Sequence, residues 1–335
     1  MRAIILKNKR IRSSSLLTTQ RDKYYKMRFS CDNFSVASPG QFVMIKVNNS
    51  YDPFLRRPMS IYKIDKKRGG FEILYQVVGK GTNIMSELKK GDEVDVLGPL
   101  GRGFWIPEKI ERAIIVAGGI GVAPMVALAE KIIKKGQGVK ESRGQGTNSS
   151  FTRTLEPSNP RILLYVFIGG KTKNDILCKE DFKRIGAKVY IATEDGSMGK
   201  KGTCVDLVRS SEFGVRNSEF KNPQSAIRNP KSVIFACGPQ GMLKTVAGIA
   251  RDKNMACQVS LDKRMACGTG TCLGCVVKVR SSEFGVRSSN PQSAIRNPQS
   301  AIRNPQSAIR NPQSYKCVCT DGPVFDSEDI NWKMI

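Results

Sequence analysis

The sequence predicts a multidomain β plus α/β protein: an antiparallel β-barrel, a parallel α/β domain and a small C-terminal domain. Short strand-like runs of alternating polarity, separated by turn residues, fill residues 1–104. Apolar runs typical of buried parallel strands then alternate with helical or loop segments in residues 105–258. Residues 259–335 are rich in cysteine. A chain of 335 residues is long enough for two or three domains with cores of their own.

The barrel is predicted from the runs QFVMIKV, MSIYKI, GFEILYQVV and DEVDVLG. Within this unit, Arg57, Pro58 and Ser60 stand at the start of one strand, and Gly81 and Thr82 follow another. Arg and Ser side chains with free backbone N–H groups can hold a diphosphate. A basic turn entering a strand is the commoner explanation when these residues are considered alone.

The α/β domain is predicted from RAIIVAG, RILLYVFIG, KVYIATE and SVIFACG. The first run ends in Gly118, Gly119 and Gly121, and a helix is expected from Pro124. Glycines at such a turn let the backbone approach a pyrophosphate, but the spacing G-G-x-G-x-x-P is equally typical of a tight strand-to-helix turn.

A second strand of this domain ends in Cys237, Gly238 and Pro239. Ligands of open α/β sheets bind at the carboxyl ends of the strands, so both glycine-containing ends are expected to face one crevice. Cys237 is also explained as a small buried residue.

Composition excludes several classes of function. The chain has no histidine, which excludes Ser-His-Asp hydrolysis, Cys-His proteolysis and His-ligated zinc. The net charge is +26, but the basic residues are scattered and no nucleic-acid motif accompanies them, so we expect no nucleic-acid partner. The uncharged run 113–129 falls short of the roughly 20 residues that span a membrane. No signal pattern opens the chain, which predicts a cytoplasmic protein.

Three polar stretches are predicted to be inserted loops. The unit NPQSAIR repeats between residues 290 and 314 and recurs within 222–232. Each unit carries a proline, which breaks a helix interior and argues against a coiled coil. We therefore expect low-complexity, disordered insertions at 210–232 and 281–314, and a further loop expansion near 136–160.

The cysteines of RMACGTGTCLGCVVKV carry the most specific signal. Cys267, Cys272 and Cys275 are separated by four and then two residues, the spacing of plant-type [2Fe–2S] sites. Zinc sites favour paired C-x-x-C groups, and only one such pair occurs here. The fourth ligand is expected in YKCVCTDGPVF, where Cys317 and Cys319 point to the same side of an extended segment, so geometry leaves both open.

The motifs RRPMSIY, GKGT, GDEVDVLGPLG, GGIGVAP, ATEDGSMGKKG, CGPQGM, MACGTGTCLGCVVKV and CTDGPVFD, in this order, resemble the electron-transfer subunit of the heteromeric, NAD-dependent dihydroorotate dehydrogenase. The resemblance covers nearly the whole chain outside the insertions. It implies a ferredoxin reductase-like flavoprotein with a FAD-binding barrel, a NAD-binding α/β domain and a [2Fe–2S] domain. The inserted repeats depart from the family pattern, and one of them separates the third and fourth cluster ligands.

The resemblance also implies roles for individual residues. The cysteine of the family's C-x-D-G-P-V-F motif corresponds to Cys319, which makes Cys317 a spare. NADH rather than NADPH is implied. Lys171 and Lys173 could meet a 2′-phosphate, but they are expected to be ordinary surface lysines. The residues implied to hold FAD are Arg57, Pro58, Met59, Ser60, Leu74, Tyr75, Gln76, Gly81 and Thr82.

The function implied is transfer of electrons between the FMN of a dihydroorotate dehydrogenase catalytic subunit and NAD, through the cluster and FAD, in pyrimidine (UMP) biosynthesis. The expected assembly is a heterotetramer with two copies of each subunit. No base for dihydroorotate is found in this chain, so that chemistry is assigned to the partner. The alternative is a diaphorase-type subunit of another complex, such as a ferredoxin:NADP oxidoreductase or a hydrogenase. Cys267 stands where the former relatives carry Asp, which favours the dihydroorotate complex.

Overall fold

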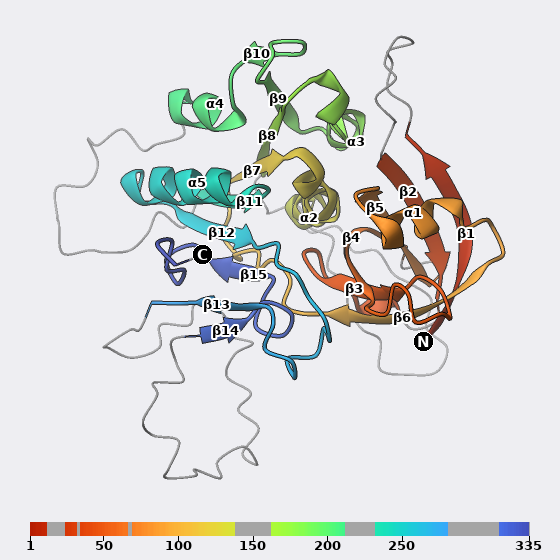
Figure 1. The fold of residues 1–335 in the computed structure, drawn as a ribbon. Coiled ribbons are helices and arrows are strands. Elements are labelled where there is room, and N and C mark those ends of the chain that lie inside the picture. Colours follow the sequence, from red (N-terminus) through yellow and green to blue (C-terminus); the bar gives the residue numbers. More distant parts are fainter. Residues whose placement is uncertain are drawn as a thin grey trace, which may run out of the picture.

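The computed structural model describes residues 1–11, 24–31, 34–65, 69–137, 162–211, 232–280 and 315–334. These residues form a closed barrel, a seven-stranded sheet and a two-stranded ribbon (Figure 1). The predicted class, a β-barrel followed by a parallel α/β domain and a small C-terminal unit, is confirmed. The insertions predicted at 136–160, 210–232 and 281–314 lie almost wholly outside the described residues.

The barrel closes six antiparallel strands in the order β1-β2-β5-β4-β3-β6. Side chains at alternate positions point inward, so Ala3 and Ile5 of β1 are fully buried and share one core with Phe71, on which Phe34 stacks. The 3-10 helix η1 (Phe34–Val36) and helix α1 (Lys80–Glu87) lie between strands. The strands are β1 (Arg2–Arg10), β2 (Tyr24–Ser30), β3 (Phe42–Lys46), β4 (Arg57–Asp65), β5 (Gly70–Gln76) and β6 (Glu93–Leu100).

The α/β sheet has the strand order β10-β9-β8-β7-β11-β12-β15, and all its neighbours are parallel except β12 and β15. The strands are β7 (Arg112–Gly118), β8 (Leu163–Gly170), β9 (Lys188–Thr193), β10 (Lys200–Lys201), β11 (Ser232–Cys237), β12 (Ala256–Ser260) and β15 (Val324–Asp326).

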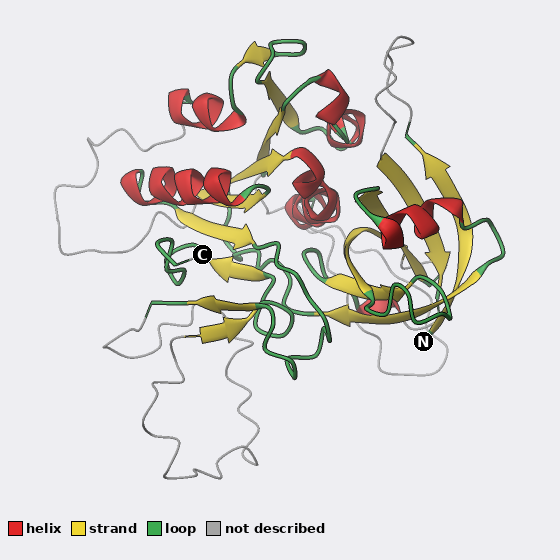
Figure 2. Cartoon of the chain, viewed as in Figure 1, coloured by secondary structure: helices red, strands yellow, loops and turns green. Residues whose placement is uncertain are grey.

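Helices cover both faces of this sheet (Figure 2). Helices α2 (Ala123–Gly136) and α3 (Lys179–Arg184) lie on the face toward the barrel, and α4 (Cys204–Ser210) and α5 (Gln240–Asp252) lie on the other. The 3-10 turns η2 (Gly119–Val122) and η3 (Lys173–Asp175) follow β7 and β8. The run 113–129 thus forms a strand, a glycine turn and a helix start, as predicted. Among the described residues, no helix has the length and apolarity needed to cross a membrane.

The C-terminal unit is joined to the sheet rather than separate from it. Strand β15 pairs with β12 through Ser260 and Val324, and the expected boundary at residue 258 falls inside β12. A second ribbon pairs β13 (Val276–Lys278) with β14 (Tyr315–Cys317). Close backbone contact also ties this unit to the end of the barrel, because Gly101 lies against Gly322 with no room for a Cβ and the N–H of Arg102 donates to the carbonyl of Gly322.

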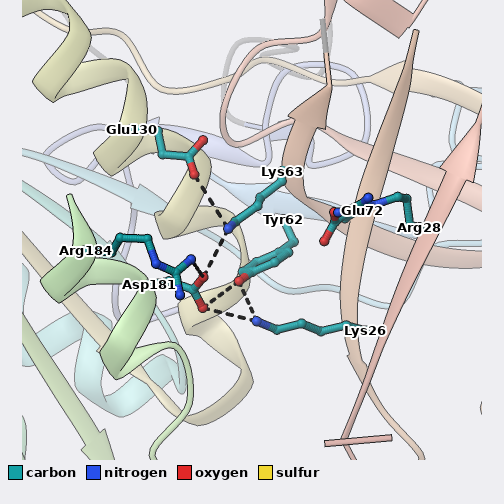
Figure 3. Close-up of polar contacts among 8 residues, drawn as sticks. All are labelled: Lys26, Arg28, Tyr62, Lys63, Glu72, Glu130, Asp181 and Arg184. Carbon is teal, nitrogen blue, oxygen red and sulfur yellow. Dashed lines mark hydrogen bonds and ion pairs between the residues drawn. The ribbon is translucent and has the colours of Figure 1, made fainter. Parts of the chain in front are cut away.

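The barrel and the α/β domain meet at a polar cluster centred on Asp181 of α3 (Figure 3). The Tyr62 hydroxyl donates to Asp181 Oδ2 at 2.7 Å, and the Lys63 ammonium donates to Oδ1 at 3.0 Å. Lys26 reaches the same carboxylate at 3.1 Å. Lys63 also faces Glu130 of α2 at 3.8 Å. Three donors from β2 and β4 therefore converge on one carboxylate of the other domain.

This carboxylate predicts a pH dependence of stability. Burial by itself raises the pKa of Asp181, but the hydrogen bond from Tyr62 and the charges of Lys26 and Lys63 outweigh burial and hold the pKa below its ordinary value of 3.8. A carboxyl whose pKa is lowered in the folded state stabilises the fold above its unfolded pKa and loses that contribution as the pH falls through the folded value. The neighbouring Cys178 stays neutral, because burial raises its pKa to about 12.

We therefore expect Asp181→Asn to lower the free energy of unfolding by about 2 kcal/mol at neutral pH, the size of a charged hydrogen bond. The difference from wild type should shrink below about pH 4, where carboxyls become protonated. Chemical denaturation of both proteins between about pH 3 and 7 measures it. A difference that stays constant over that whole range contradicts this origin.

Candidate functional site

A large cavity lies between the barrel and the carboxyl ends of the parallel strands. Its volume is about 1970 Å³, which exceeds the roughly 300–1,000 Å³ of an ordinary single-ligand pocket. Every cofactor residue predicted from the sequence lines it except Arg57 and Gly81. The lining residues among them are Pro58, Met59, Ser60, Leu74, Tyr75, Gln76 and Thr82 from the barrel and Gly118, Gly119, Gly121, Pro124, Cys237, Gly238 and Pro239 from the α/β domain.

The barrel wall of the cavity comes from β4 and β5. On β4, Met59 and Ser60 are half-buried, whereas the following residues turn into the core. On β5, Tyr75 is 2 % exposed and its hydroxyl donates to Asn8 Oδ1 at 3.4 Å inside the barrel, so it offers a ligand mainly its backbone. Gln76 at the strand end is half-buried and polar. The alternation of the strands thus decides which predicted residues can contact a ligand through their side chains.

Arg57 and Gly81 lie against one another beside the cavity. A Cβ at Gly81 would stand 2.2 Å from Arg57 Nε, so the glycine makes room for the guanidinium. Arg57 Nη1 donates to the Leu55 carbonyl at 2.9 Å. Thr82 caps its own helix, because its Oγ1 accepts the N–H of Gly79, the residue that precedes α1, at 3.2 Å. The guanidinium therefore lies beside the first turn of α1, whose N–H groups have no partner within the helix.

This packing predicts an effect of Gly81→Ala on FAD affinity. The added methyl group displaces the Arg57 guanidinium and removes a charge-assisted contact of about 1.5–3 kcal/mol. We expect FAD to bind about 10- to 100-fold more weakly, measured by fluorescence titration of deflavinated protein. Gly79→Ala is the matched control, since nothing lies within 4 Å of its Cβ position. Equal FAD affinity in the two variants would contradict the role of Arg57.

Glycines on the α/β side let the ends of β7 and β11 touch. A Cβ at Gly118 would stand 2.7 Å from Pro239 Cδ, and one at Gly121 would stand 2.5 Å from the Cys237 carbonyl oxygen. Gly119 has a φ of +54° and open space beside it. The turn between β7 and α2 is therefore both tightly packed against β11 and free of side chains where it faces the cavity, as a pyrophosphate requires.

Several cavity residues were not predicted from the sequence. Glu194 follows β9, Thr203 precedes α4, and Leu261 and Met265 follow β12. Lys171 and Lys173, expected to be ordinary surface lysines, also line the cavity at the end of β8. The rule that ligands bind at the carboxyl ends of parallel strands could have indicated the residues after β9 and β12.

The cysteine loop 267–275 packs against the barrel and the segment 317–320. Gly268 has a φ of +78° and lies against Met44 of β3, and Gly270 lies against Thr320. Backbone N–H groups point at the sulfurs: Thr269 and Cys272 each donate to Cys267 Sγ at 3.4 Å. The N–H groups of Gly274 and Cys319 donate to Cys272 Sγ and Cys275 Sγ at 3.5 and 3.4 Å. Glycines with positive φ turn these donors inward.

The two candidate fourth ligands differ in their contacts with the loop. The Cys319 thiol lies within hydrogen-bonding reach of Cys275 and of the Gly270 backbone, and its side chain is 1 % exposed. The N–H of Cys317 donates instead to Asp321 Oδ2 at 2.9 Å, and Cys317 pairs with Val276 in the ribbon of β13 and β14. These contacts favour Cys319, the residue that the family motif indicates.

The donor set fits an iron–sulfur cluster. Two N–H donors lower the pKa of Cys267 to about 5, whereas burial and the hydrogen bond to Cys275 raise the pKa of Cys319 to about 12, so the latter loses its proton on metal binding. Within the residues that the structure describes, no three Cys, Asp or Glu side chains surround a single ion position. A two-iron cluster takes two thiolates on each iron, so its four ligands need not converge on one point.

Comparison with known protein families matches the chain in three consecutive parts. Residues 24–105 match the oxidoreductase FAD-binding domain, and residues 115–248 match the oxidoreductase NAD-binding domain. Residues 262–287 match the iron–sulfur cluster binding domain of dihydroorotate dehydrogenase B. The three matches fall on the barrel, the parallel sheet and the cysteine loop, so FAD, NAD and an iron–sulfur cluster are the cofactors of this chain, as predicted.

Curated relatives cover nearly the whole chain. The dihydroorotate dehydrogenase B (NAD(+)) electron transfer subunit of Desulforamulus reducens is 32 % identical over 310 residues, which are 92 % of this chain and 93 % of the relative. The subunit of the same description from Bacillus caldolyticus is 34 % identical over 296 residues, 87 % of this chain and 86 % of the relative.

Solved structures share the fold. The structure of an NADH-dependent reduced ferredoxin-NADP oxidoreductase superposes with a TM-score of 0.66 at 24 % identity, covering 98 % of this chain and 90 % of that one. A ferredoxin NADP⁺ reductase from Neisseria gonorrhoeae superposes with a TM-score of 0.53 at 13 % identity, covering 76 % and 91 %. Both place this chain in the ferredoxin reductase-like fold.

Proposed function

Because the chain belongs to the family of dihydroorotate dehydrogenase B (NAD(+)) electron transfer subunits, we propose that it connects NAD to the FMN of a separate catalytic subunit through FAD and the cluster. It is a subunit of an NAD-linked oxidoreductase. We further propose that this chain and the catalytic subunit form a heterotetramer of two copies of each, which works in pyrimidine biosynthesis. Ten free cysteines agree with a compartment that keeps thiols reduced, the cytoplasm.

The observation that carries the proposal is the shared cavity. One wall offers Ser60 and Gln76 of the barrel, and the other offers the glycine turns at the ends of β7 and β11. A flavin held by the first wall and a nicotinamide held by the second would lie in one cavity, where the FAD would supply hydride exchange with NAD and single-electron exchange with a cluster. We propose the three units as the FAD, NAD and cluster units, divided near residue 104 and, within strand β12 of the shared sheet, near residue 258.

Individual roles follow from the contacts. Arg57, with the first turn of α1, would hold the FAD diphosphate, and Pro58, Met59, Ser60, Leu74, Tyr75, Gln76, Gly81 and Thr82 would form the rest of that site. Gly118, Gly119, Gly121, Pro124, Cys237, Gly238 and Pro239 would form the NAD site. Cys267, Cys272, Cys275 and Cys319 would hold the cluster. None of these roles needs a side-chain acid or base, and the proton chemistry of dihydroorotate is assigned to the partner.

The test is co-expression with the catalytic subunit. We expect one FAD and one two-iron cluster per copy of this chain, and NAD⁺ reduction that depends on dihydroorotate. A purified complex without FAD would refute the barrel assignments. Zinc in place of iron, or no paramagnetic signal after dithionite reduction, would refute the cluster. Reduction of ferredoxin but not of orotate by NADH would favour the diaphorase-type alternative.

A further inference from the structure

We propose that Asp181 is a positioning residue that fixes the orientation of the barrel relative to the α/β domain, and so sets how NAD meets FAD across the cavity. The inference rests on the proposed function and deepens it. It concerns a residue outside the cavity lining, in a helix that no cofactor motif includes.

The hydrogen bonds at Asp181 fix the orientation of its carboxylate. Its carboxylate is 12 % exposed and accepts from Tyr62 through Oδ2 and from Lys63 through Oδ1 (Figure 3). The ammonium of Lys26 donates both to Oδ2, at 3.1 Å, and to the Tyr62 hydroxyl, at 2.6 Å. Two oxygens held by three donors from two strands permit little rotation of α3 against the barrel. Charge-assisted hydrogen bonds of this kind are shorter and stronger than neutral ones.

A second hydrogen bond joins the same two parts at the rim of the cavity. The Tyr24 hydroxyl donates to Asp175 Oδ1 at 2.9 Å, and both residues line the cavity. Asp175 is held in turn by the N–H of Thr172, which donates to Oδ2 at 3.2 Å. The segment from residue 172 to 184, which follows β8, is therefore attached to β2 through Asp175 and to β2 and β4 through Asp181.

This attachment links the two walls by short paths. On the barrel side, Tyr62 lies two residues beyond Ser60 on the same strand, β4. On the other side, the attached segment begins two residues after Gly170, which ends β8 and lines the cavity. A shift of α3 against β4 therefore changes the separation or angle of the two cavity walls.

Apart from the Lys63–Glu130 ion pair and the backbone contact of Gly101 and Arg102 with Gly322, the remaining contact between the parts is mostly apolar. Buried residues of α2, among them Val126 and Ala129, share one core with Tyr62 and Leu74 of the barrel. Apolar contact holds two surfaces together but does not select one relative orientation, because the hydrophobic effect depends on the apolar area buried and not on the angle between the surfaces. The apolar core thus holds the barrel and the α/β domain together, and the Asp181 carboxylate fixes their relative orientation.

The experiment compares the purified holo-complex of wild type with Asp181→Asn, which keeps the volume of the side chain and removes its charge. Glu180→Gln is the matched control, since Glu180 neighbours Asp181 on α3, is 71 % exposed and pairs with Lys183 of its own helix. Tyr62→Phe is the second variant, because it removes one donor to Asp181 and keeps the buried ring. The measured step is rapid reduction of FAD by NADH: the hydride leaves NADH as NAD⁺, and the flavin takes a further proton from solvent.

We expect Asp181→Asn to slow FAD reduction by about 10- to 100-fold, because a displacement of about 1 Å can cost that much. The dissociation constant for NADH, the FAD content and the iron content should stay close to wild type. The long-wavelength charge-transfer absorbance of the nicotinamide–flavin pair should weaken, and amides of residues 172–184 should exchange hydrogen faster. Tyr62→Phe should change the same quantities in the same direction by less, and Glu180→Gln should change none.

A lower melting temperature with wild-type FAD reduction and wild-type charge-transfer absorbance in Asp181→Asn would overturn the proposal, because it would show a structural role alone. If Asp181→Asn does not fold, Tyr62→Phe decides by the same two readouts. A wild-type complex whose FAD is not reduced by NADH would instead refute the proposed function, and the positioning role with it.

Discussion

Cys319→Ser abolishes the iron–sulfur cluster, and Cys317→Ser leaves it in place: this is the expected outcome with the largest effect. Cys319 contacts Cys275 both through its thiol and through its N–H, whereas the N–H of Cys317 donates to Asp321. Loss of a partner that only orients a metal ligand already costs about 10- to 100-fold in metal affinity or activity. Loss of the ligand itself should therefore lower dihydroorotate-dependent NAD⁺ reduction by at least about 100-fold.

Iron content, visible absorbance and the paramagnetic signal after dithionite reduction measure the cluster directly. NADH-driven reduction of an artificial acceptor through FAD should persist in Cys319→Ser, because it needs the cavity and not the cluster. This reaction shows that the variant is folded. A cluster retained in Cys319→Ser and lost in Cys317→Ser would reverse the assignment.

Gly121→Ala is expected to disable the NAD site. Its Cβ would stand 2.5 Å from the Cys237 carbonyl oxygen and 2.7 Å from Gly238 Cα, and backbone atoms cannot move aside as a flexible side chain can. The ends of β7 and β11 must separate, which costs about 1–3 kcal/mol in stability and displaces the glycine turn. We expect NADH to bind at least about tenfold more weakly, since 1.4 kcal/mol is a factor of ten.

Titration of the holo-complex with NADH, together with thermal unfolding, tests this prediction. Gly248→Ala is the matched control: Gly248 lies inside α5 with nothing within 4 Å of its Cβ position. There alanine should raise stability by up to about 1 kcal/mol, because it is the better helix former. Unchanged NADH affinity in Gly121→Ala would show that close approach of the two strand ends is not required.

Local patterns predicted most of the elements. Alternating polarity identified the strands of the barrel, and the glycine-rich end of β7 identified the turn into α2. Such patterns depend on neighbours a few residues apart, so they can be recognised in a single sequence. They did not reveal that Tyr75 turns into the barrel core, nor that Arg57 and Gly81 lie beside the cavity and not in its lining, because these placements depend on the pairing of β4 and β5 with the rest of the barrel.

The sequence by itself determined the class of the fold, the spacing of three cysteines and the glycine turns, since each of these features depends on residues close together along the chain. Tertiary structure alone decided the rest. It brought β4 and β5 of the barrel to the ends of β7 and β11, joined β15 to β12 across a boundary expected at residue 258, and set Asp181 against Lys26, Tyr62 and Lys63. These contacts join residues far apart in the chain, and only packing of the whole molecule determines which distant groups meet.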